Sequence, residues 1–472
     1  MTADVAPTDA PTQGALVTVN PADGTEIARH RTHTAADIDQ IVAAAHHAQT
    51  PWSTRPIAER AEHLRALARA LRDARPALAD LVVAEMGKPV TEARAEVDKC
   101  AWVCEYYAEH GPAVLADEPV ASGVSRSWVA HEPLGVVLAV MPWNFPLWQV
   151  LRFAAPALLA GNAGLLKHSP NVTGTALAVE KIMRDAGLPP DIFRVLVVAE
   201  ADVPDTVNRL LADDRVAAAT LTGSERAGKA IAAAAGSALK KTVLELGGSD
   251  PFVVLDDADL DVVVPAAVTS RFLNSGQSCL AAKRFIVSRA IAPEFTRRFA
   301  AAVNELPVGD PTDENTRIGP LARADLVDAL DAQVRASADA GASIVAGGHR
   351  LDRPGAWYAP TVLAEVTLDM PVMAEETFGP AAAVHVVDND DEAAAVANAT
   401  PYGLGASVWS RDPDRALTLG RRITSGALFV NAVVASDPRL PFGGTKRSGY
   451  GRELGSAGLL EFVNVRTYAV GA

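Results

Sequence analysis

Three residues of the chain have side chains and settings in which chemistry could take place. Cys279 lies in the stretch GQSC, whose glycine and polar neighbours differ from the apolar surroundings of a structural cysteine. The stretch follows an expected helix end, so exposed backbone amides should lower the pKa of the thiol and stabilise an adjacent oxyanion. We therefore interpret Cys279 as a nucleophile, and Glu245 as its partner base.

Glu245 ends an apolar strand in the stretch LELGGSDP and precedes two glycines, which places its carboxylate at the mouth of a cleft. Partly apolar surroundings should raise its pKa toward that of a general base. A carboxylate that ends a strand and forms a salt bridge is the common alternative. The third residue, Asn144, is held in place by the aromatic residues and prolines of MPWNFP. A turn that caps the following helix explains Asn144 at least as well as catalysis does.

Other motifs argue against two enzyme classes. A cysteine hydrolase usually takes histidine as its base, but none of the ten histidines lies in a comparable strand-end loop, and the serine-hydrolase pattern GxSxG does not occur. The loop LTGSERAGKA approaches the phosphate-binding pattern GxxxxGK followed by Ser or Thr, but Ala230 replaces that hydroxyl residue. A nucleotide triphosphatase is therefore disfavoured. A glycine turn before a helix N-terminus still suits a diphosphate.

These loops need strands that bring them together. From residue 134 onward, short apolar runs alternate with helical stretches, a pattern that predicts parallel α/β sheets. Parallel sheets bind ligands at the carboxyl ends of their strands, where all three residues are expected. The predicted strands are residues 134–141, 164–167, 217–223 and 242–248, then 251–257, 284–288 and 343–348. Helices are predicted at 35–49, 56–110, 259–274, 292–304 and 322–340. Two α/β domains should meet near residue 246.

Composition limits the function further. The chain has 472 residues, too many for one hydrophobic core, and a net charge of −14 with acidic and basic residues mixed throughout. Without a run of lysine or arginine, nucleic acid and membrane surfaces are not expected partners. The N-terminus lacks the basic and apolar blocks of a signal peptide, and the apolar run at residues 134–143 is too short to span a bilayer, so a cytoplasmic protein is expected. The three cysteines indicate neither a disulfide framework nor a metal site.

Several stretches resemble those of the aldehyde dehydrogenase superfamily, from about residue 17 to the end of the chain. They are PWNFP (142–146), GNAGLLKHSP (161–170), LTGSERAG (221–228), LELGGSDP (244–251), GQSC (276–279), EETFGP (375–380) and PFGGTKRSGYGREL (441–454). The spacing between Glu245 and Cys279 is that of the family's catalytic pair. Within the superfamily, DPFVVLDDADLD, NFPLWQVLRFAAPALLAGN and KRSGYGREL look most like the bacterial succinate-semialdehyde dehydrogenases, which oxidise succinate semialdehyde to succinate.

The resemblance implies an α/β fold with two parallel-sheet domains and a small oligomerisation arm. Residues 1–118 and 134–245 would form the coenzyme-binding domain, and residues 246–440 the catalytic domain. Residues 119–133 would pair with the C-terminal tail, residues 441–472, and bridge subunits. Members of the family are dimers or tetramers, so a homodimer or homotetramer is expected.

The resemblance also implies a reaction. Cys279 would attack the carbonyl carbon of a small aldehyde while the Asn144 amide and the Cys279 backbone N–H hold the oxyanion. Hydride transfer to a nicotinamide would leave a thioester, which a water activated by Glu245 would hydrolyse. Retention of Glu245 favours hydrolysis over transfer to coenzyme A. The rivals are an aldehyde dehydrogenase of broader specificity, a cofactor-independent cysteine esterase or thioesterase, and an inactive descendant, which should have lost one of these three residues.

The resemblance assigns binding residues as well. The cofactor-binding set comprises Trp143, Lys167, His168, Ser169, Pro170, Gly223, Ser224, Leu246, Glu376 and Phe378. Strict NAD users of the family tend to carry a glutamate where this chain has Pro170, so NADP is the expected cofactor and NAD the alternative. Arg152, eight residues after Asn144 on the following helix, would bind the substrate carboxylate, and Ser436 is a further candidate. A surface arginine paired with a carboxylate is the alternative for Arg152.

Overall fold

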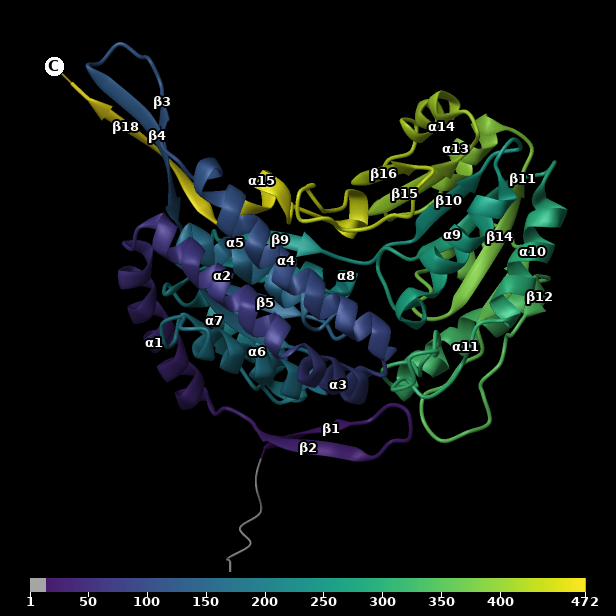
Figure 1. Ribbon diagram of the computed structural model, residues 1–472, viewed down its shortest axis with the longest axis horizontal. Coiled ribbons are helices and arrows are strands. Elements are labelled where there is room, and N and C mark those ends of the chain that lie inside the picture. Colours follow the sequence, from purple (N-terminus) through teal and green to yellow (C-terminus); the bar gives the residue numbers. More distant parts are fainter. Residues whose placement is uncertain (1–13, 472) are drawn as a thin grey trace, which may run out of the picture.

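Two β-sheets, one in each half of the chain, organise the protein. The computed structural model describes residues 14–471, and Figure 1 shows the two α/β domains side by side. Most strands are parallel to their neighbours, as the alternation of apolar runs and helices predicts. The predicted fold class is confirmed.

The first sheet has six strands in the order β17-β9-β8-β5-β6-β7, and all except β17 run parallel. Glu245 is the last residue of β9, so its side chain lies at a carboxyl end, as predicted. The strands are β5 (Val136–Met141), β6 (Ala163–His168), β7 (Phe193–Val195), β8 (Val216–Thr222), β9 (Lys241–Glu245) and β17 (Gly449–Tyr450). A separate hairpin, β1 (Ala15–Val19) and β2 (Glu26–Arg31), precedes them.

The predicted helical stretch 56–110 is three helices in the structure. Ala74 closes the first of them, and Pro76 lies in the first turn of the next, where its missing N–H costs nothing. Gly87 ends the second in a left-handed conformation, with φ of 75°. The helices of this domain are α1 (Ala35–Ser53), α2 (Ile57–Asp73), α3 (Arg75–Met86), α4 (Val90–Val114), α5 (Trp148–Ala160), α6 (Thr173–Asp185), α7 (Val203–Ala212), α8 (Glu225–Ser237) and α15 (Gly455–Leu459).

The second sheet has seven strands in the order β12-β13-β14-β11-β10-β15-β16. The stretch 343–348 was expected to extend a parallel sheet, but β12 runs antiparallel to β13, because a loop and not a crossover helix joins them. The strands are β10 (Asp250–Val254), β11 (Ala282–Ser288), β12 (Ser343–Ala346), β13 (Thr361–Ala364), β14 (Ala381–Val387), β15 (Gly405–Trp409) and β16 (Ala427–Val430). The helices are α9 (Leu260–Phe272), α10 (Ala292–Asn304), α11 (Ala324–Asp339), α12 (Pro371–Ala374), α13 (Asp390–Asn398) and α14 (Pro413–Gly420).

An antiparallel three-stranded arm projects from the first domain, at the upper left of Figure 1. Its middle strand, β4 (Arg126–Pro133), pairs with β3 (Glu118–Pro119) on one side and β18 (Val463–Val470) on the other. Within residues 441–471, the described part of the expected tail (441–472), only β18 joins the arm. The preceding strand β17 pairs with β9, and α15 contacts α4 and α5 of the first domain.

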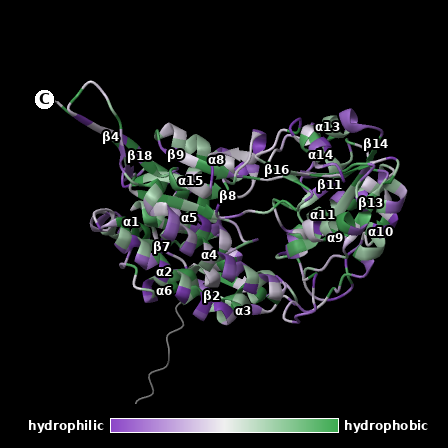
Figure 2. Ribbon diagram, turned by 45° about the horizontal axis from the view of Figure 1, so that its top comes forward, coloured by the Kyte–Doolittle hydropathy of each residue, from purple (hydrophilic) through white to green (hydrophobic). Residues whose placement is uncertain are grey.

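Apolar side chains fill both domains, and the strands of the two sheets are mostly hydrophobic in Figure 2. In the second sheet, Val253 belongs to one buried cluster, whereas its neighbours Phe252 and Val254 belong to another. Successive side chains of a strand point to opposite faces, so this sheet is covered on both faces. Two covered sheets provide a rigid base for the loops at their strand ends.

Candidate active site

Cys279 lies in a tight loop between α9 and β11. The chain leaves α9 through Asn274, Ser275 and Gly276, which all have positive φ, of 54°, 54° and 74°. Gly276 also lies so close to the backbone carbonyl of Gly379 that a Cβ atom would collide with it. The glycine of GQSC therefore allows the cysteine loop to pack directly against the stretch EETFGP.

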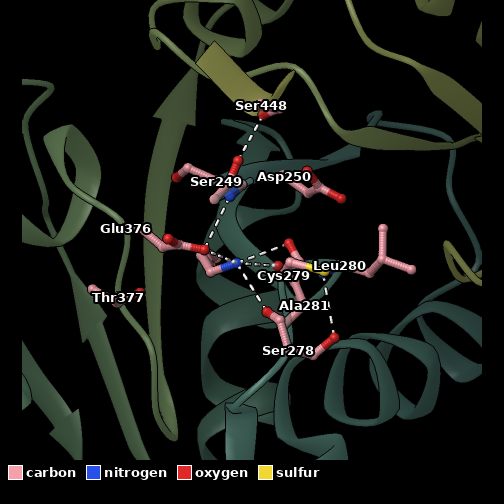
Figure 3. A network of polar contacts seen from close by, with 12 residues as sticks. Ser249, Asp250, Ser278, Cys279, Leu280, Ala281, Glu376, Thr377 and Ser448 are labelled. Carbon is pink, nitrogen blue, oxygen red and sulfur yellow. Dashed lines mark hydrogen bonds and ion pairs between the residues drawn. The ribbon is translucent and has the colours of Figure 1, made fainter. Parts of the chain in front are cut away.

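A buried lysine holds the backbone around the thiol. Lys283 Nζ donates to the carbonyl oxygens of Ser278 at 3.1 Å and Cys279 at 3.0 Å. It also lies 3.6 Å from Glu376 Oε1, which accepts a hydrogen bond from the Gly248 N–H at 2.9 Å. Figure 3 shows Ser278, Cys279 and Glu376 in this network of polar contacts. These contacts join GQSC, EETFGP and LELGGSDP into one network. Lys283 was not among the residues predicted from the sequence.

The Asn144 amide is fixed beside the cysteine loop. Its Nδ2 donates to the Gln277 carbonyl oxygen at 3.1 Å, and its Oδ1 accepts from Gln149 Nε2 at 3.0 Å. Helix α5 begins after Leu147 with no side-chain cap, so Asn144 does not cap that helix. The second amide proton of Asn144 remains a possible donor to a ligand.

Glu245 is 2% exposed, and its carboxylate oxygens accept no hydrogen bond from residues 14–471. Burial raises its pKa well above the usual range, and the neighbouring Glu453 carboxylate adds to the shift, while Arg152 opposes it. The predicted direction of the pKa shift is confirmed. No salt bridge to Glu245 forms in the described part of the chain, so the alternative of a strand-end ion pair does not apply.

The prediction for the Cys279 thiol was wrong in one respect. Burial raises its pKa to about 12, although Arg152 and Lys283 act in the opposite direction. The reason is that residues from distant elements of both domains surround the thiol, which the local sequence cannot reveal. The Cys279 backbone N–H donates no hydrogen bond to any described residue, so it can still meet an oxyanion.

Cys279 belongs to the walls of two cavities. One has a volume of about 340 Å³ and is lined from α4, α5, α9 and the loop 433–436. The other, of about 190 Å³, lies between the loops that follow β5, β8 and β9. The two cavities share Cys279 and Gln149. A molecule in either cavity can therefore reach the thiol.

The smaller cavity brings together most of the residues expected to bind a cofactor. Those that line it are Trp143, Gly223, Ser224, Leu246, Glu376 and Phe378, together with Asn144 and Glu245. The Trp143 and Phe378 rings meet edge to face at 5.7 Å, and Ser224 caps α8 by accepting from the Ala227 N–H. A Cβ atom at Gly247 would collide with the Glu376 carboxylate, so the glycine leaves room for that side chain at the cavity wall.

The other expected cofactor residues lie at the end of β6, outside that cavity wall. His168 is buried, and its ring contacts the carbonyl oxygens of Met141 and Pro146, so it supports the MPWNFP loop. Burial lowers its pKa to about 4, so the ring is neutral. Ser169 donates to the Asn171 side chain. Pro170 begins a short 3₁₀ turn, Pro170–Val172, before α6.

Arg152 lines the larger cavity but already has a partner. It is 3% exposed and forms an ion pair with Glu453, and its Nη2 donates to Thr222 Oγ1 at 3.2 Å. Its guanidinium also lies 4.8 Å from the centre of the Phe442 ring. The alternative considered for Arg152, a pairing with a carboxylate, is therefore present, but inside the protein and not on its surface.

Ser436 lines the same cavity and accepts a hydrogen bond from Lys99 Nζ at 2.8 Å. Sequence reasoning missed Lys99 and Glu453, because nothing in their local sequences marks them as neighbours of Cys279.

Within residues 14–471, no three His, Cys, Asp or Glu side chains cluster in a way that could hold a metal ion. None of the helices in this part of the chain has the length and apolar character needed to cross a membrane.

Known proteins match this sequence and this fold over nearly their whole length. The pattern of the aldehyde dehydrogenase family matches residues 8–468. A probable succinate-semialdehyde dehydrogenase (NADP(+)) of Synechocystis sp. is 49% identical over 453 residues, which cover 96% of this chain and 99% of that protein. The succinate semialdehyde dehydrogenase (NAD(P)+) Sad of Escherichia coli is 47% identical over 451 residues, covering 96% of this chain and 97% of that protein.

A solved structure gives the same result for the fold. The succinic semialdehyde dehydrogenase of Streptococcus pyogenes, solved in complex with NADP+, is 36% identical and superposes with a TM-score of 0.94. The superposition covers 97% of this chain and 100% of that one.

Proposed function

The chain belongs to the aldehyde dehydrogenase family, and from this premise we propose that it oxidises succinate semialdehyde to succinate with NADP as the preferred hydride acceptor. One observation carries the proposal. Cys279 lies where a cavity lined by the expected cofactor residues meets a second cavity that can hold a small aldehyde. The relatives named above are succinate-semialdehyde dehydrogenases for NADP or for either cofactor.

The first half of the reaction takes place at Cys279. The S–H proton of Cys279 passes to solvent, and the thiolate that remains attacks the carbonyl carbon of the aldehyde and forms a covalent adduct with a negatively charged oxygen. The Asn144 amide, oriented by Gln149, and the Cys279 backbone N–H stabilise the negative charge that develops on the carbonyl oxygen. The bound nicotinamide supplies the hydride acceptor, and the adduct becomes a thioester on Cys279.

The second half depends on Glu245. Its carboxylate removes a proton from a water molecule, which then attacks the thioester and releases the acid and the thiol. The raised pKa of Glu245 makes it a stronger base than an exposed carboxylate. We assign the roles of nucleophile, base and oxyanion donor to Cys279, Glu245 and Asn144.

The residues present fit a nicotinamide dinucleotide. Gly223 and Ser224 lead into α8, whose N-terminal N–H groups suit a diphosphate. Lys167 and Glu376 would bind the ribose groups, with Phe378 near the nicotinamide ribose. Lys167 is buried, and no carboxylate of residues 14–471 lies within 4.0 Å of its ammonium. Pro170 places no negative charge near a 2′-phosphate, which supports NADP over NAD.

We also propose that the arm formed by β3, β4 and β18 joins subunits into a homodimer or homotetramer. Among residues 14–471, no further strand pairs with the outer edges of this small sheet, and an unpaired edge is a common site of association between chains. The size of the particle in sedimentation experiments would test this proposal. We propose a cytoplasmic location as well.

Steady-state kinetics test the proposed function. The specificity constant kcat/KM should be higher for succinate semialdehyde than for butanal, the uncharged aldehyde of equal carbon number, and higher with NADP than with NAD. Equal constants for the two aldehydes would favour an enzyme of broader specificity. Turnover of thioesters without any nicotinamide would instead favour a cysteine hydrolase.

A further inference from the structure

Gln149 has a buried amide oxygen without a hydrogen-bond partner. Of residues 14–471, Gln149 and the nucleophile Cys279 are the two that line both cavities. Gln149 lies in the first turn of α5 and is 2% exposed. Its Nε2 donates to Asn144 Oδ1, but its Oε1 accepts no hydrogen bond from residues 14–471. Because a buried polar atom without a partner costs free energy, this oxygen suggests a role toward a bound molecule.

The neighbours of the Gln149 amide fix its orientation. The Gln277 carbonyl oxygen can only accept, so Asn144 must turn its Nδ2 toward it, as it does at 3.1 Å. Asn144 Oδ1 then faces Gln149, which must present its Nε2 in return, at 3.0 Å. Exchange of nitrogen and oxygen in either side chain would bring two donors or two acceptors together. The unpartnered atom of Gln149 is therefore an acceptor, which only a proton donor can satisfy.

A second buried acceptor lines the smaller cavity. Among the residues of its wall, Gln149 and Glu245 are the two whose buried side-chain oxygens accept no hydrogen bond from residues 14–471. The cavity volume of about 190 Å³ exceeds the roughly 30 Å³ that one water molecule occupies in the liquid. A water molecule has two O–H donors, one for each residue. Neither an aldehyde group nor a thioester has such a donor, so water is the reactant that fits.

We propose that Gln149 is a further catalytic residue, whose Oε1 accepts a hydrogen bond from the water that Glu245 deprotonates and so directs that water at the thioester on Cys279. The inference rests on the proposed function, because the thioester is an intermediate of that reaction. Glu245 takes one proton, the water oxygen bonds to the carbonyl carbon, and the C–S bond breaks with its electron pair left on Cys279. The O–H bond held by Gln149 stays intact and becomes the hydroxyl of the acid.

The two contacts of Gln149 affect the two half-reactions differently. Its contact with Asn144 orients the oxyanion donor, and a negatively charged oxygen develops both when the thioester forms and when it is hydrolysed. A contact with water matters in hydrolysis alone. Removal of the Gln149 amide should therefore slow hydrolysis more than it slows formation of the thioester.

An activated ester separates the two steps without any nicotinamide. p-Nitrophenyl acetate transfers its acetyl group to the Cys279 thiolate and releases p-nitrophenolate, which leaves a thioester on the enzyme. With enzyme in excess, absorbance measures formation of this thioester, and intact mass of quenched samples measures its decay. Gln149→Met, which has a similar volume and no amide, should slow formation by about fivefold or less and decay by about 10- to 100-fold. Asn144→Ala should slow both steps by similar factors.

Controls test whether the effect belongs to water. Gln40→Met, at an exposed position of α1, should leave both rates unchanged. Hydroxylamine attacks a thioester without a base, so it should release the acetyl group from Gln149→Met and from the wild type at rates within about fivefold. Gln149→Asn keeps the amide but withdraws it by one methylene, and it should also slow decay more than formation. Circular dichroism verifies that each variant is folded.

The outcomes separate the inference from the proposed function. If Gln149→Met slows formation and decay by the same factor, Gln149 acts only through Asn144 and the inference is wrong. If both rates are unchanged and the Kd for NADP rises instead, Oε1 binds the carboxamide of the nicotinamide and the inference is also wrong. A wild type that hydrolyses its acetyl thioester but oxidises no aldehyde with NADP or NAD would disprove the proposed function, because the ester assay needs neither cofactor nor aldehyde.

Discussion

Replacement of Glu245 by glutamine should divide the catalytic cycle into its two halves. The glutamine has nearly the same shape, and no hydrogen bond is lost, because the carboxylate oxygens accept none from residues 14–471. Formation of the thioester needs Cys279 and Asn144, which the change leaves in place. Hydrolysis of the thioester needs a base, which the change removes.

The size of the effect follows from the role of the residue. A positioned general base contributes about 10²- to 10⁴-fold to the rate of the step that it assists. Steady-state turnover of Glu245→Gln should fall by that factor, which corresponds to roughly 2.7–5.4 kcal/mol in the activation free energy. The first turnover should remain fast and should release about one equivalent of reduced cofactor per active subunit.

Stopped-flow absorbance of the reduced nicotinamide measures both quantities in one experiment. Glu62→Gln, an exposed position on α2, serves as the matched control and should behave as the wild type. Loss of the burst together with turnover would refute the reasoning, because it would mean that Glu245 also removes the proton from the Cys279 thiol.

The Glu245→Gln variant should also show that protonation of Glu245 is linked to the stability of the folded protein. Because the pKa of Glu245 is raised in the native state, the folded protein keeps a proton that the unfolded chain releases above about pH 4.5. The wild type therefore loses stability as the pH rises above that value, and the glutamine variant lacks this loss. The Tm of Glu245→Gln relative to the wild type should increase between pH 4 and pH 8. A constant difference would contradict the raised pKa.

Three other predictions concern single positions. The rate of Cys279 alkylation by iodoacetamide should rise about tenfold per pH unit from pH 7 to pH 10, because its pKa is about 12; a plateau near neutral pH would show a thiolate already formed. Gly276→Ala should lower the free energy of unfolding in urea by about 1–3 kcal/mol because of its positive φ, whereas Gly236→Ala, which meets no atom within 4 Å, should cost nothing. Pro170→Glu should lower kcat/KM with NADP at least about tenfold through repulsion of the 2′-phosphate, and an unchanged ratio of NADP to NAD would show that the phosphate binds elsewhere.

The positions of the loops that carry Glu245 and Cys279 could be predicted from the sequence. Glu245 follows an apolar run of strand length, and parallel strands bring their carboxyl ends to one edge. A loop at GQSC could also be predicted, because the conformation of a glycine-containing loop depends largely on its immediate neighbours in the sequence. Predictions of this kind succeed where a few adjacent residues determine the structure.

Long-range neighbours could not be predicted. Arg152 was expected to face a ligand, but Glu453, some three hundred residues later in the chain, pairs with it. The pKa of Cys279 is raised by burial that involves both domains. Lys99 lies on an ordinary helical stretch of α4, and only the fold brings it to Ser436. In each case, the environment of the side chain depends on packing between distant elements, and neither periodicity nor local composition contains that information.

The pairing of β17 with β9 has a consequence for biosynthesis. The chain leaves the first sheet at Glu245, forms the whole second domain, and only then returns to add Gly449 and Tyr450 opposite Glu245 and Leu244. On the ribosome, β9 is therefore an open edge until the second domain has been made, and open edges pair readily with other chains. We expect nascent chains arrested before residue 449 to engage chaperones, since the edge of their first sheet beside Glu245 is still unpaired.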